Sequence, residues 1–328
     1  MAEDRPRVLV TGGSSGIGFE LARQFAESGH DVVLTARDAD KLEQAAELIR
    51  ERAPEVTVTT VAADLASEPG IYELHRSAGQ IDILCANAGI GSGGGDFTET
   101  DLGQELELID LNVRGQVQLA KLVVKDMAGR GEGRLLFTSS IAGIMPGPFE
   151  AVYAASKAFI RSFGEALRNE LKDKGIGVTV FMPGPTETDF FRRANMDNTP
   201  AGQASKDDAA QVAAQAIDAL FADKHAVVTG SLKTRLQGNV AKLMSNPARA
   251  AMHRKQTEPF DRSQEEQGSG GIGAAAIGGL FFVGALAAAG TAAWLQSRRD
   301  EQDVERRTRH RLEPKADFEV ANTRNMNS

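Results

Sequence analysis

Short apolar runs, many of them β-branched, alternate with longer amphipathic stretches along the first 230 residues. Runs of this kind are typical of strands buried on both faces of a sheet, and the amphipathic stretches, such as 38–52 and 151–173, are typical of helices. Because strands that alternate with helices form right-handed βαβ crossovers, the pattern predicts an α/β fold, a doubly wound parallel seven-stranded sheet with helices on both faces. The predicted strands are residues 8–11, 31–36, 56–64, 81–89, 133–140, 177–184 and 225–230.

The pattern changes after this predicted domain, residues 1–230. Residues 231–267 form a polar extension rich in Arg and Lys, and residues 268–297 carry no charge. The apolar centre of that segment is long enough to cross a hydrocarbon core of ~30 Å, so it predicts a C-terminal hydrophobic helix that spans a membrane. Residues 298–328 mix both charge signs densely and predict a disordered tail.

Other interpretations of the uncharged segment stay open. Its Gly and Ala content would also suit a flexible linker or a buried hairpin. The positive-inside tendency would place the Arg-rich tail in the cytoplasm. A domain without a signal peptide also belongs there, although a single span would put the tail and the domain on opposite sides of the membrane. We expect a membrane-associated protein with its folded domain in the cytosol and its tail translocated. Without a span, the protein would be soluble and cytoplasmic.

Composition excludes several kinds of partner. The 328 residues carry a formal net charge of -8, and no basic block occurs before the extreme C-terminus, so nucleic acid is not an expected partner. Cys85 is the single cysteine and lies in an apolar run. There is therefore no disulfide framework and no cysteine metal site, and no metal is expected.

Glycine-rich and polar motifs follow the predicted strands. In the stretch "VLVTGGSSGIG", residues 8–18, a strand, a glycine turn and a helix start in succession, which is the geometry that presents backbone N–H groups to a pyrophosphate. A purely structural turn would also fit, because the spacing differs from the commonest dinucleotide fingerprint. Further motifs follow other strands, at Arg37, Asp64, 87–89, 139–140 and 183–184. Since carboxyl ends of parallel strands share one edge, they predict a single site.

The stretch "YAASK" places Tyr153 and Lys157 four residues apart in a predicted helix. This spacing puts both side chains on one helix face. A phenol with a pKa of about 10 is a poor base near neutral pH, and a fixed ammonium nearby would lower that value. The alternative is an unrelated pair, a core tyrosine and a lysine that reaches solvent.

The motifs together resemble the short-chain dehydrogenase/reductase family. The resemblance covers about residues 6–230 and implies a Rossmann sheet. It rests on "TGGSSGIG" (11–18), "NAG" (87–89), "LNV" (111–113), "SS" (139–140), "YAASK" (153–157) and "PGPTET" (183–188), in the family's order and spacing.

The resemblance also implies roles for individual residues. Tyr153 would be the general acid when a carbonyl is reduced and the base when an alcohol is oxidised. Lys157 would bind the nicotinamide ribose, Ser140 rather than Ser139 would orient the substrate oxygen, and Asn112 would anchor a water of a proton relay. The cofactor site would comprise Gly12, Ser14, Ser15, Gly16, Ile17, Gly18, Arg37, Asp64, Leu65, Asn87, Ala88, Gly89, Tyr153, Lys157, Pro183, Gly184 and Thr188.

The end of the second strand bears on the choice of cofactor. An acidic residue there would bind the ribose 2′-OH of NAD and repel the 2′-phosphate of NADP, but this chain has Ala36. Arg37 follows, and its guanidinium suits a phosphate. Arg37 could also be a solvated side chain beside Asp38, a plausible helix N-cap. We expect NADP(H). Asp64 would contact the adenine or, alternatively, cap the next helix.

The substrate region corresponds to residues 185–206, where the family has a variable lid. Phe190, Phe191 and Met196 in the lid, with residues 143–151 opposite, indicate a lipophilic ketone or aldehyde. The glycine loop and the hydrophobic segment are similar to those of 3-ketosphinganine reductases, and a retinoid or steroid alcohol is another candidate. Non-catalytic alternatives are an NADP(H) sensor and a membrane scaffold built on residues 268–328. The Ala-rich face of 151–163 would suit a homodimer.

Overall fold

The computed structural model describes residues 5–241 and 243–260 of the 328. The predicted membrane segment, 268–297, and the predicted tail, 298–328, lie outside the described residues. Within the described residues, no helix combines the length and apolar character needed to cross a membrane. The predicted C-terminal hydrophobic helix therefore receives no support from the structure.

One parallel sheet of seven strands forms the centre of the fold, as predicted, in the order β3-β2-β1-β4-β5-β6-β7. The direction of chain progression reverses between β1 and β4, which are neighbours in the sheet. In doubly wound sheets, ligands bind at such a reversal, beyond the carboxyl ends of the strands. The strands are β1 (Arg7–Thr11), β2 (Asp31–Ala36), β3 (Val58–Ala62), β4 (Ile83–Ala86), β5 (Gly133–Thr138), β6 (Ile176–Pro183) and β7 (Ala226–Thr229).

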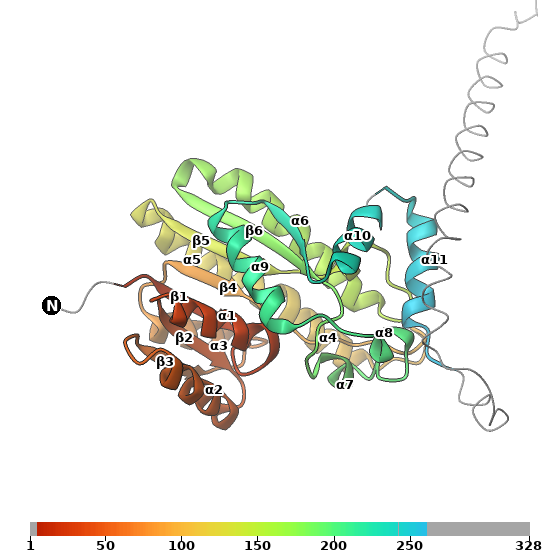
Figure 1. Cartoon of the computed structure of the whole chain (residues 1–328), viewed down its shortest axis with the longest axis horizontal. Coiled ribbons are helices and arrows are strands. Elements are labelled where there is room, and N and C mark those ends of the chain that lie inside the picture. Colours follow the sequence, from red (N-terminus) through yellow and green to blue (C-terminus); the bar gives the residue numbers. More distant parts are fainter. Residues whose placement is uncertain (1–4, 242, 261–328) are drawn as a thin grey trace, which may run out of the picture. The chain divides into compact units, whose positions relative to one another are not determined.

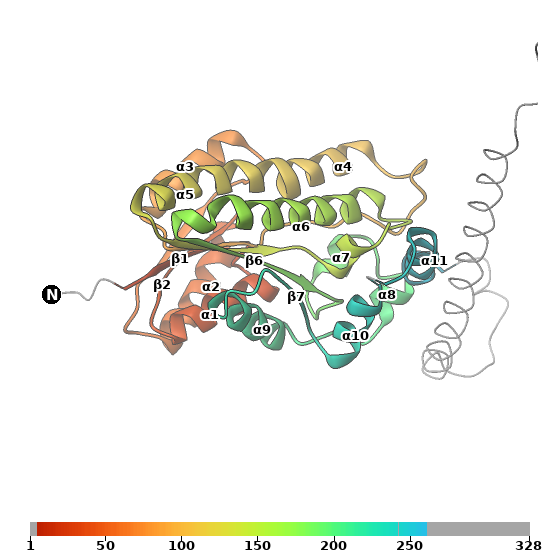
Figure 2. The same cartoon turned by 90° about the horizontal axis from the view of Figure 1, so that it is seen from above.

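Helices cover both faces of the sheet (Figure 2). One layer contains α1 (Gly16–Glu27), α2 (Ala39–Arg52) and α9 (Ala209–Phe221), whose apolar residues share a core cluster with Val10 and Leu34. The other contains α3 (Glu68–Ala78), α5 (Gln116–Arg130) and α6 (Ala151–Leu171), which pack around Leu84 and Phe137, and α4 (Leu102–Ile109), whose Leu108 packs against Tyr153 of α6. Burial on both faces explains why the strands have continuous apolar sequences.

A π-helical turn, η1 (Asp110–Gly115), joins α4 to α5. Such turns insert one extra residue into a helix and occur frequently at functional sites. Asn112 lies in this turn and is fully buried. Two short 3₁₀ turns, η2 (Ile141–Ile144) and η3 (Lys172–Lys174), follow β5 and α6 respectively.

The predicted lid contains two short helices, α7 (Phe190–Arg193) and α8 (Pro200–Gln203). Its two ends meet in a neck formed by an isolated parallel bridge between Thr186 and Asp207. The backbone N–H of Glu187 donates to the Asp207 carbonyl over 2.9 Å, and that of Asp207 donates to the Pro185 carbonyl over 2.7 Å. The lid is thus a loop closed at its base.

The predicted polar extension forms two helices, α10 (Leu232–Ala241) and α11 (Asn246–Thr257), which the sequence did not reveal. Helix α10 contacts β7, and α11 contacts α8 of the lid. Ala241 and Met252 pack against Ile144, Met182 and Val228. Figure 1 shows α7, α8, α10 and α11 gathered at the carboxyl edge of the sheet, away from the N-terminus.

Candidate active site

A cavity of about 630 Å³ lies at the carboxyl edge of the sheet. It brings together most of the predicted residues, from the glycine turn, the ends of β2, β4, β5 and β6, helix α6 and the lid. Asn112 and Asp64 do not line it. The predicted residues that do are Gly12, Ser14, Ser15, Gly16, Ile17, Gly18, Arg37, Leu65, Asn87, Ala88, Gly89, Ser140, Tyr153, Lys157, Pro183, Gly184 and Thr188.

The glycine turn between β1 and α1 is held in a conformation that requires glycine. Gly12 has a φ of 67°, and its N–H donates to the Thr35 carbonyl over 2.9 Å. A Cβ on Gly18 would lie 2.1 Å from the Gly12 carbonyl oxygen, so the first turn of α1 can pack closely on the loop only without a side chain. The same turn therefore brings backbone N–H groups to the cavity wall.

The N-terminus of α1 has the features of an anion site. Ser15 is its N-cap residue but makes no side-chain cap hydrogen bond within the described chain, whereas Asp38, Ser67, Asp101 and Asp208 do cap their helices. The first-turn N–H groups of α1 are thus available, and the helix dipole favours a negative group there. The turn fits the pyrophosphate of a dinucleotide.

The segment after β4 is fixed by hydrogen bonds to both neighbouring strands. The Asn87 amide donates to the Thr11 carbonyl over 3.0 Å and accepts from the Thr138 hydroxyl over 3.1 Å. The backbone N–H groups of Asn87 and Ala88 both donate to the Thr11 hydroxyl, over 2.9 and 2.8 Å. Asn87 therefore links β1, β4 and β5 at the reversal point of the sheet.

Tyr153 and Lys157 project from α6 and are both buried. The Lys157 ammonium lies 5.8 Å from the centre of the Tyr153 ring and donates to the Thr138 carbonyl over 3.2 Å. Burial raises the pKa of the Tyr153 phenol, the charge of Glu150 raises it further, and a side-chain hydrogen bond with Ser140 lowers it. Burial lowers the pKa of Lys157 to about 8.

The net effect on Tyr153 differs from the sequence expectation, which was a lowered pKa. Desolvation favours the neutral form of a phenol, and inside this cavity it is the largest influence. In the structure as described, Tyr153 therefore holds its proton at neutral pH, which is the form that can act as an acid.

The two serines after β5 have different surroundings. The Ser139 hydroxyl donates to the Lys157 carbonyl over 2.7 Å and so ties α6 to the sheet. The Ser140 hydroxyl lines the cavity, accepts from the Ala142 N–H over 3.1 Å and interacts with Tyr153. Ser139 also lines the cavity, but its hydroxyl is engaged with the backbone of α6, whereas the Ser140 hydroxyl lies beside Tyr153.

Asn112 lies behind the cavity. Its amide accepts from the Ile90 N–H over 2.9 Å and donates to the Ile90 carbonyl over 2.8 Å and to Ser156 over 3.2 Å. A Cβ added to Gly89 would lie 3.0 Å from the Asn112 carbonyl oxygen and 3.2 Å from the Lys157 ammonium. Asn112 and Lys157 therefore approach the same point on the backbone.

Two predicted cofactor residues have partners that the sequence did not suggest. Arg37 is half exposed, and its guanidinium pairs with Glu107 of α4 over 2.8 Å. Asp64 accepts from the Ala66 N–H over 3.1 Å and lies off the cavity, while its neighbour Leu65 lines it. Asp38 caps α2, as expected, through the Lys41 N–H.

The lid side of the cavity combines apolar and polar walls. Phe190 packs 5.2 Å from the Tyr153 ring, and Phe191 and Met196 lie beside it. Glu150 and His253 also line the cavity and are joined by a hydrogen bond of 2.5 Å. Sequence reasoning missed Glu107 and His253, and it included Glu150 in the predicted wall 143–151 without its partner. The 103 residues that separate Glu150 from His253 leave no local signal of their contact.

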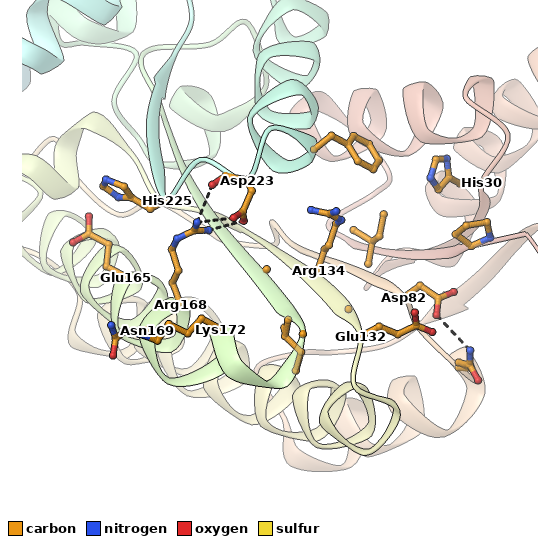
Figure 3. A pocket seen from close by; sticks show the side chains of 18 of the residues that line it. His30, Asp82, Glu132, Arg134, Glu165, Arg168, Asn169, Lys172, Asp223 and His225 are labelled. Atoms are coloured by element: carbon orange, nitrogen blue, oxygen red, sulfur yellow. Dashed lines mark hydrogen bonds and ion pairs between the residues drawn. The ribbon is translucent and has the colours of Figure 1, made fainter.

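A second cavity, of about 1040 Å³, opens at the amino edge of the sheet (Figure 3). Two of its charged side chains, Arg168 and Asp223, bind each other, and Arg134 binds the backbone. Arg168 donates twice to the Asp223 carboxylate, each over 2.8 Å, and Arg134 donates to the Leu220 carbonyl over 3.2 Å. None of the predicted site residues lines it.

A parallel sheet of seven strands, with a glycine turn between its first strand and first helix, places the fold among those of the dinucleotide-binding Rossmann type. The family model for short chain dehydrogenases matches residues 6–199. The chain belongs to this family, whose members act on CH–OH groups.

Individual relatives agree with this membership. The chain is 34% identical over 265 residues to Dehydrogenase/reductase SDR family member 7B of Bos taurus, covering 74% of this chain and 81% of that protein. A short-chain dehydrogenase from Sphingobium yanoikuyae in complex with NADPH is similar in structure, with a TM-score of 0.64, 30% identity and coverage of 68% and 87%. A 3-ketoacyl-(acyl-carrier-protein) reductase from Brucella melitensis complexed with NADH has a TM-score of 0.58, 27% identity and coverage of 68% and 96%.

Proposed function

We propose that the protein is an NADP(H)-dependent oxidoreductase that reduces a lipophilic ketone or aldehyde. The observation that carries the proposal is that Ser140, Tyr153 and Lys157 share one cavity with the glycine turn at residues 12–18. An acid, a hydrogen-bond donor and a cation are thereby placed beside an anion site that fits a dinucleotide.

The nicotinamide, when bound, supplies the hydride for reduction or accepts it in oxidation. The chain supplies the proton and its control. Tyr153, whose pKa is raised by burial, gives the proton of its phenol oxygen to the carbonyl oxygen, and the Ser140 hydroxyl hydrogen-bonds the same oxygen. Lys157, with its pKa near 8, is mostly protonated at pH 7, and its charge stabilises the phenolate that remains.

Arg37 and Lys41 support the preference for NADP(H). Both line the cavity at the end of β2, where Ala36 offers no carboxylate to repel a phosphate. Arg37 is held by Glu107 and Lys41 by Asp38, over 2.8 and 3.1 Å, and both pairs are largely exposed. Exposed pairs contribute only about 0–1 kcal/mol, so a 2′-phosphate can replace these partners.

Because similar structures hold either NADPH or NADH, cofactor preference needs a direct test. The two dinucleotides would be titrated separately into the full-length protein, with nucleotide fluorescence as the signal. We expect NADPH to bind at least tenfold more tightly, about 1.4 kcal/mol. Equal or tighter binding of NADH would overturn the role of Arg37 in binding the 2′-phosphate. If neither dinucleotide bound, the proposed oxidoreductase activity would be contradicted.

The lid favours a lipophilic substrate. Phe190, Phe191 and Met196 present an apolar wall next to Tyr153, which suits an alkyl or ring portion of a ketone rather than a sugar. A 3-ketosphinganine and a retinoid or steroid alcohol are specific candidates within this class. A panel of such compounds, measured by NADPH consumption, would rank them.

A homodimer is a further part of the proposal. Helices α4 and α6 contact each other and carry the exposed apolar side chains of Leu102, Leu106 and Phe159. Exposed apolar residues on adjacent helices favour burial against a second copy. Sedimentation of the full-length protein would give a dimer mass, and a monomer mass at micromolar concentration would contradict it.

Membrane attachment through residues 268–297 stays a prediction from the sequence, since those residues lie outside the described part of the chain. Extraction of cell membranes with alkaline carbonate tests it. An integral protein remains in the pellet, whereas release into the supernatant would exclude a span.

A further inference from the structure

Glu150 and His253 form a buried polar pair that the reaction described above does not use. The His253 Nε2 and Glu150 Oε1 atoms are 2.5 Å apart, and the residues are 4% and 6% exposed. Both line the cavity that contains Tyr153. Burial of an ionisable pair costs free energy of desolvation, so its position beside the reacting centre calls for a function.

The backbone that delivers Glu150 to the cavity is strained. Phe149 has a φ of 62°, which is uncommon for a residue with a large side chain. Its carbonyl accepts from the Gly94 N–H over 2.9 Å, and the Arg254 guanidinium lies 5.0 Å from the centre of its ring. Strain of this kind costs about 1–3 kcal/mol and tends to be retained at functional sites.

The pair is not the main attachment of α11 to the loop before α6. Arg249 donates to the Ile144 carbonyl over 2.7 Å, and Thr257 donates to the Pro148 carbonyl over 2.8 Å. These two hydrogen bonds hold α11 on either side of His253, one helical turn away in each direction. Anchoring alone therefore gives no reason for a buried carboxylate between them.

Hydrogen-bonding capacity of the pair remains unused. The Glu150 Oε2 atom receives no hydrogen bond from the described residues and keeps some accessible surface, whereas the His253 Nδ1 atom also lacks a partner among them but is fully buried. The contact with His253 Nε2 occupies Oε1 of Glu150 and leaves Oε2 as an acceptor. One accessible acceptor thus remains, on a residue that lines the cavity.

We propose that Glu150, held in place by His253, forms a polar subsite that accepts a hydrogen bond from a donor group of the substrate, a hydroxyl or an ammonium, close to the carbonyl that is reduced. The apolar remainder of the substrate lies on Phe190, Phe191 and Met196. This inference rests on the proposed function and narrows its substrate class to lipophilic ketones that carry a neighbouring donor. The influence of the Glu150 charge on the Tyr153 phenol agrees with their proximity.

The first test measures kcat and KM of the full-length protein with NADPH for three ketones of equal chain length: 2-decanone, 1-hydroxy-2-decanone and 1-amino-2-decanone. We expect kcat/KM to be at least tenfold higher for one or both donor-bearing ketones, because a site built to bind a donor discriminates against its absence. The ketone that shows the higher kcat/KM identifies the donor group, a hydroxyl or an ammonium. Equal values for all three would overturn the proposal.

Variants separate recognition from structure. Glu150→Gln and His253→Gln should reduce the preference for the donor-bearing ketone over 2-decanone to within about threefold, mainly through KM of the donor-bearing ketone. Arg249→Gln is the matched control, since Arg249 also anchors α11 but does not line the cavity. Arg249→Gln should change kcat/KM for all three ketones by the same factor. If Glu150→Gln lowered kcat/KM by the same factor for all three ketones, Glu150 would have a merely structural role and the subsite would be refuted.

A binding measurement keeps the inference distinct from the proposed function. Calorimetric titration compares 1,2-decanediol with 2-decanol on the full-length protein. Tighter binding of the diol by fivefold or more, abolished in Glu150→Gln, supports the subsite even if no ketone is reduced. Equal binding of the two alcohols overturns the subsite even if every ketone is reduced.

Discussion

The two edges of the sheet differ in how deeply their ionisable groups are buried. At the amino edge, Arg168 and Asp223 bind each other and Arg134 binds a backbone carbonyl. At the carboxyl edge, Tyr153, Lys157 and His253 are buried with hydrogen-bonding capacity left over or pKa values displaced. The larger cavity is at the amino edge, so volume does not identify the site. Buried ionisable groups with shifted pKa values or without hydrogen-bond partners do identify it.

The strongest test of this contrast removes the phenol oxygen. Tyr153→Phe should lower kcat about 10³-fold, because general acid catalysis contributes about 10²–10⁴-fold. Steady-state kinetics with NADPH and the best ketone measure it. NADPH affinity should change little, and a variant that kept a tenth of wild-type kcat would refute the role of Tyr153 as the acid.

Lys157 should be a site where function opposes stability. Its folded-state pKa of about 8 lies below the ordinary 10.5, so the unfolded chain binds more protons between these pH values. Wild-type stability gains from this group as pH rises from 8 to 10.5, and below pH 8 a constant penalty of about 3 kcal/mol applies.

Lys157→Met removes that penalty. The variant should be inactive, yet it should unfold at a higher temperature than the wild type at pH 7, with the difference shrinking as pH approaches 10.5. Thermal unfolding of both proteins across this pH range checks the prediction. A difference that did not vary with pH would contradict the lowered pKa.

The amino edge should respond in the opposite way. Arg168→Gln breaks a partly exposed pair with Asp223 and a hydrogen bond to the Val178 carbonyl. We expect a loss of about 1 kcal/mol in the free energy of unfolding and no change in kcat/KM. Chemical denaturation and steady-state kinetics measure the two quantities. A tenfold loss of kcat/KM in a stable variant would contradict the prediction that the amino edge contributes to stability and not to activity.

The smallest effect is expected at Glu107. Glu107→Gln frees the Arg37 guanidinium from its exposed partner, so NADPH should bind about two- to threefold more tightly while NADH is unaffected. Fluorescence titration of both nucleotides tests this. Weaker NADPH binding would mean that Glu107 positions Arg37 for the phosphate instead of competing with it.

Local patterns in the sequence were sufficient for the sheet and for most of the cavity wall. Strands buried on both faces have continuous apolar runs, and the motifs after them share one edge because the strands are parallel. The phenol pKa was predicted in the wrong direction, because burial of Tyr153 raises it, the charge of Glu150 raises it further, and burial is a property of the packed fold.

Long-range contacts explain what was missed. Helix α11 has a mostly polar sequence, and its role depends on Arg249, His253 and Thr257, which face the loop before α6 from one side of the helix. Their spacing of four residues, and Pro247 in the first turn, were available signals for a helix. Their partners, more than 100 residues earlier in the chain, were not.

The neck of the lid has a consequence for how this protein could diversify. Thr186 and Asp207 meet at its base, and Asp207 is held independently by the Thr234 hydroxyl over 2.6 Å. A change in the number of residues between them adds little cost of loop closure, since doubling a loop costs only about 0.6 kcal/mol in closure entropy. Insertions and exchanges in this segment can therefore produce enzymes with new substrate ranges while the sheet, the glycine turn and α6 are inherited unchanged.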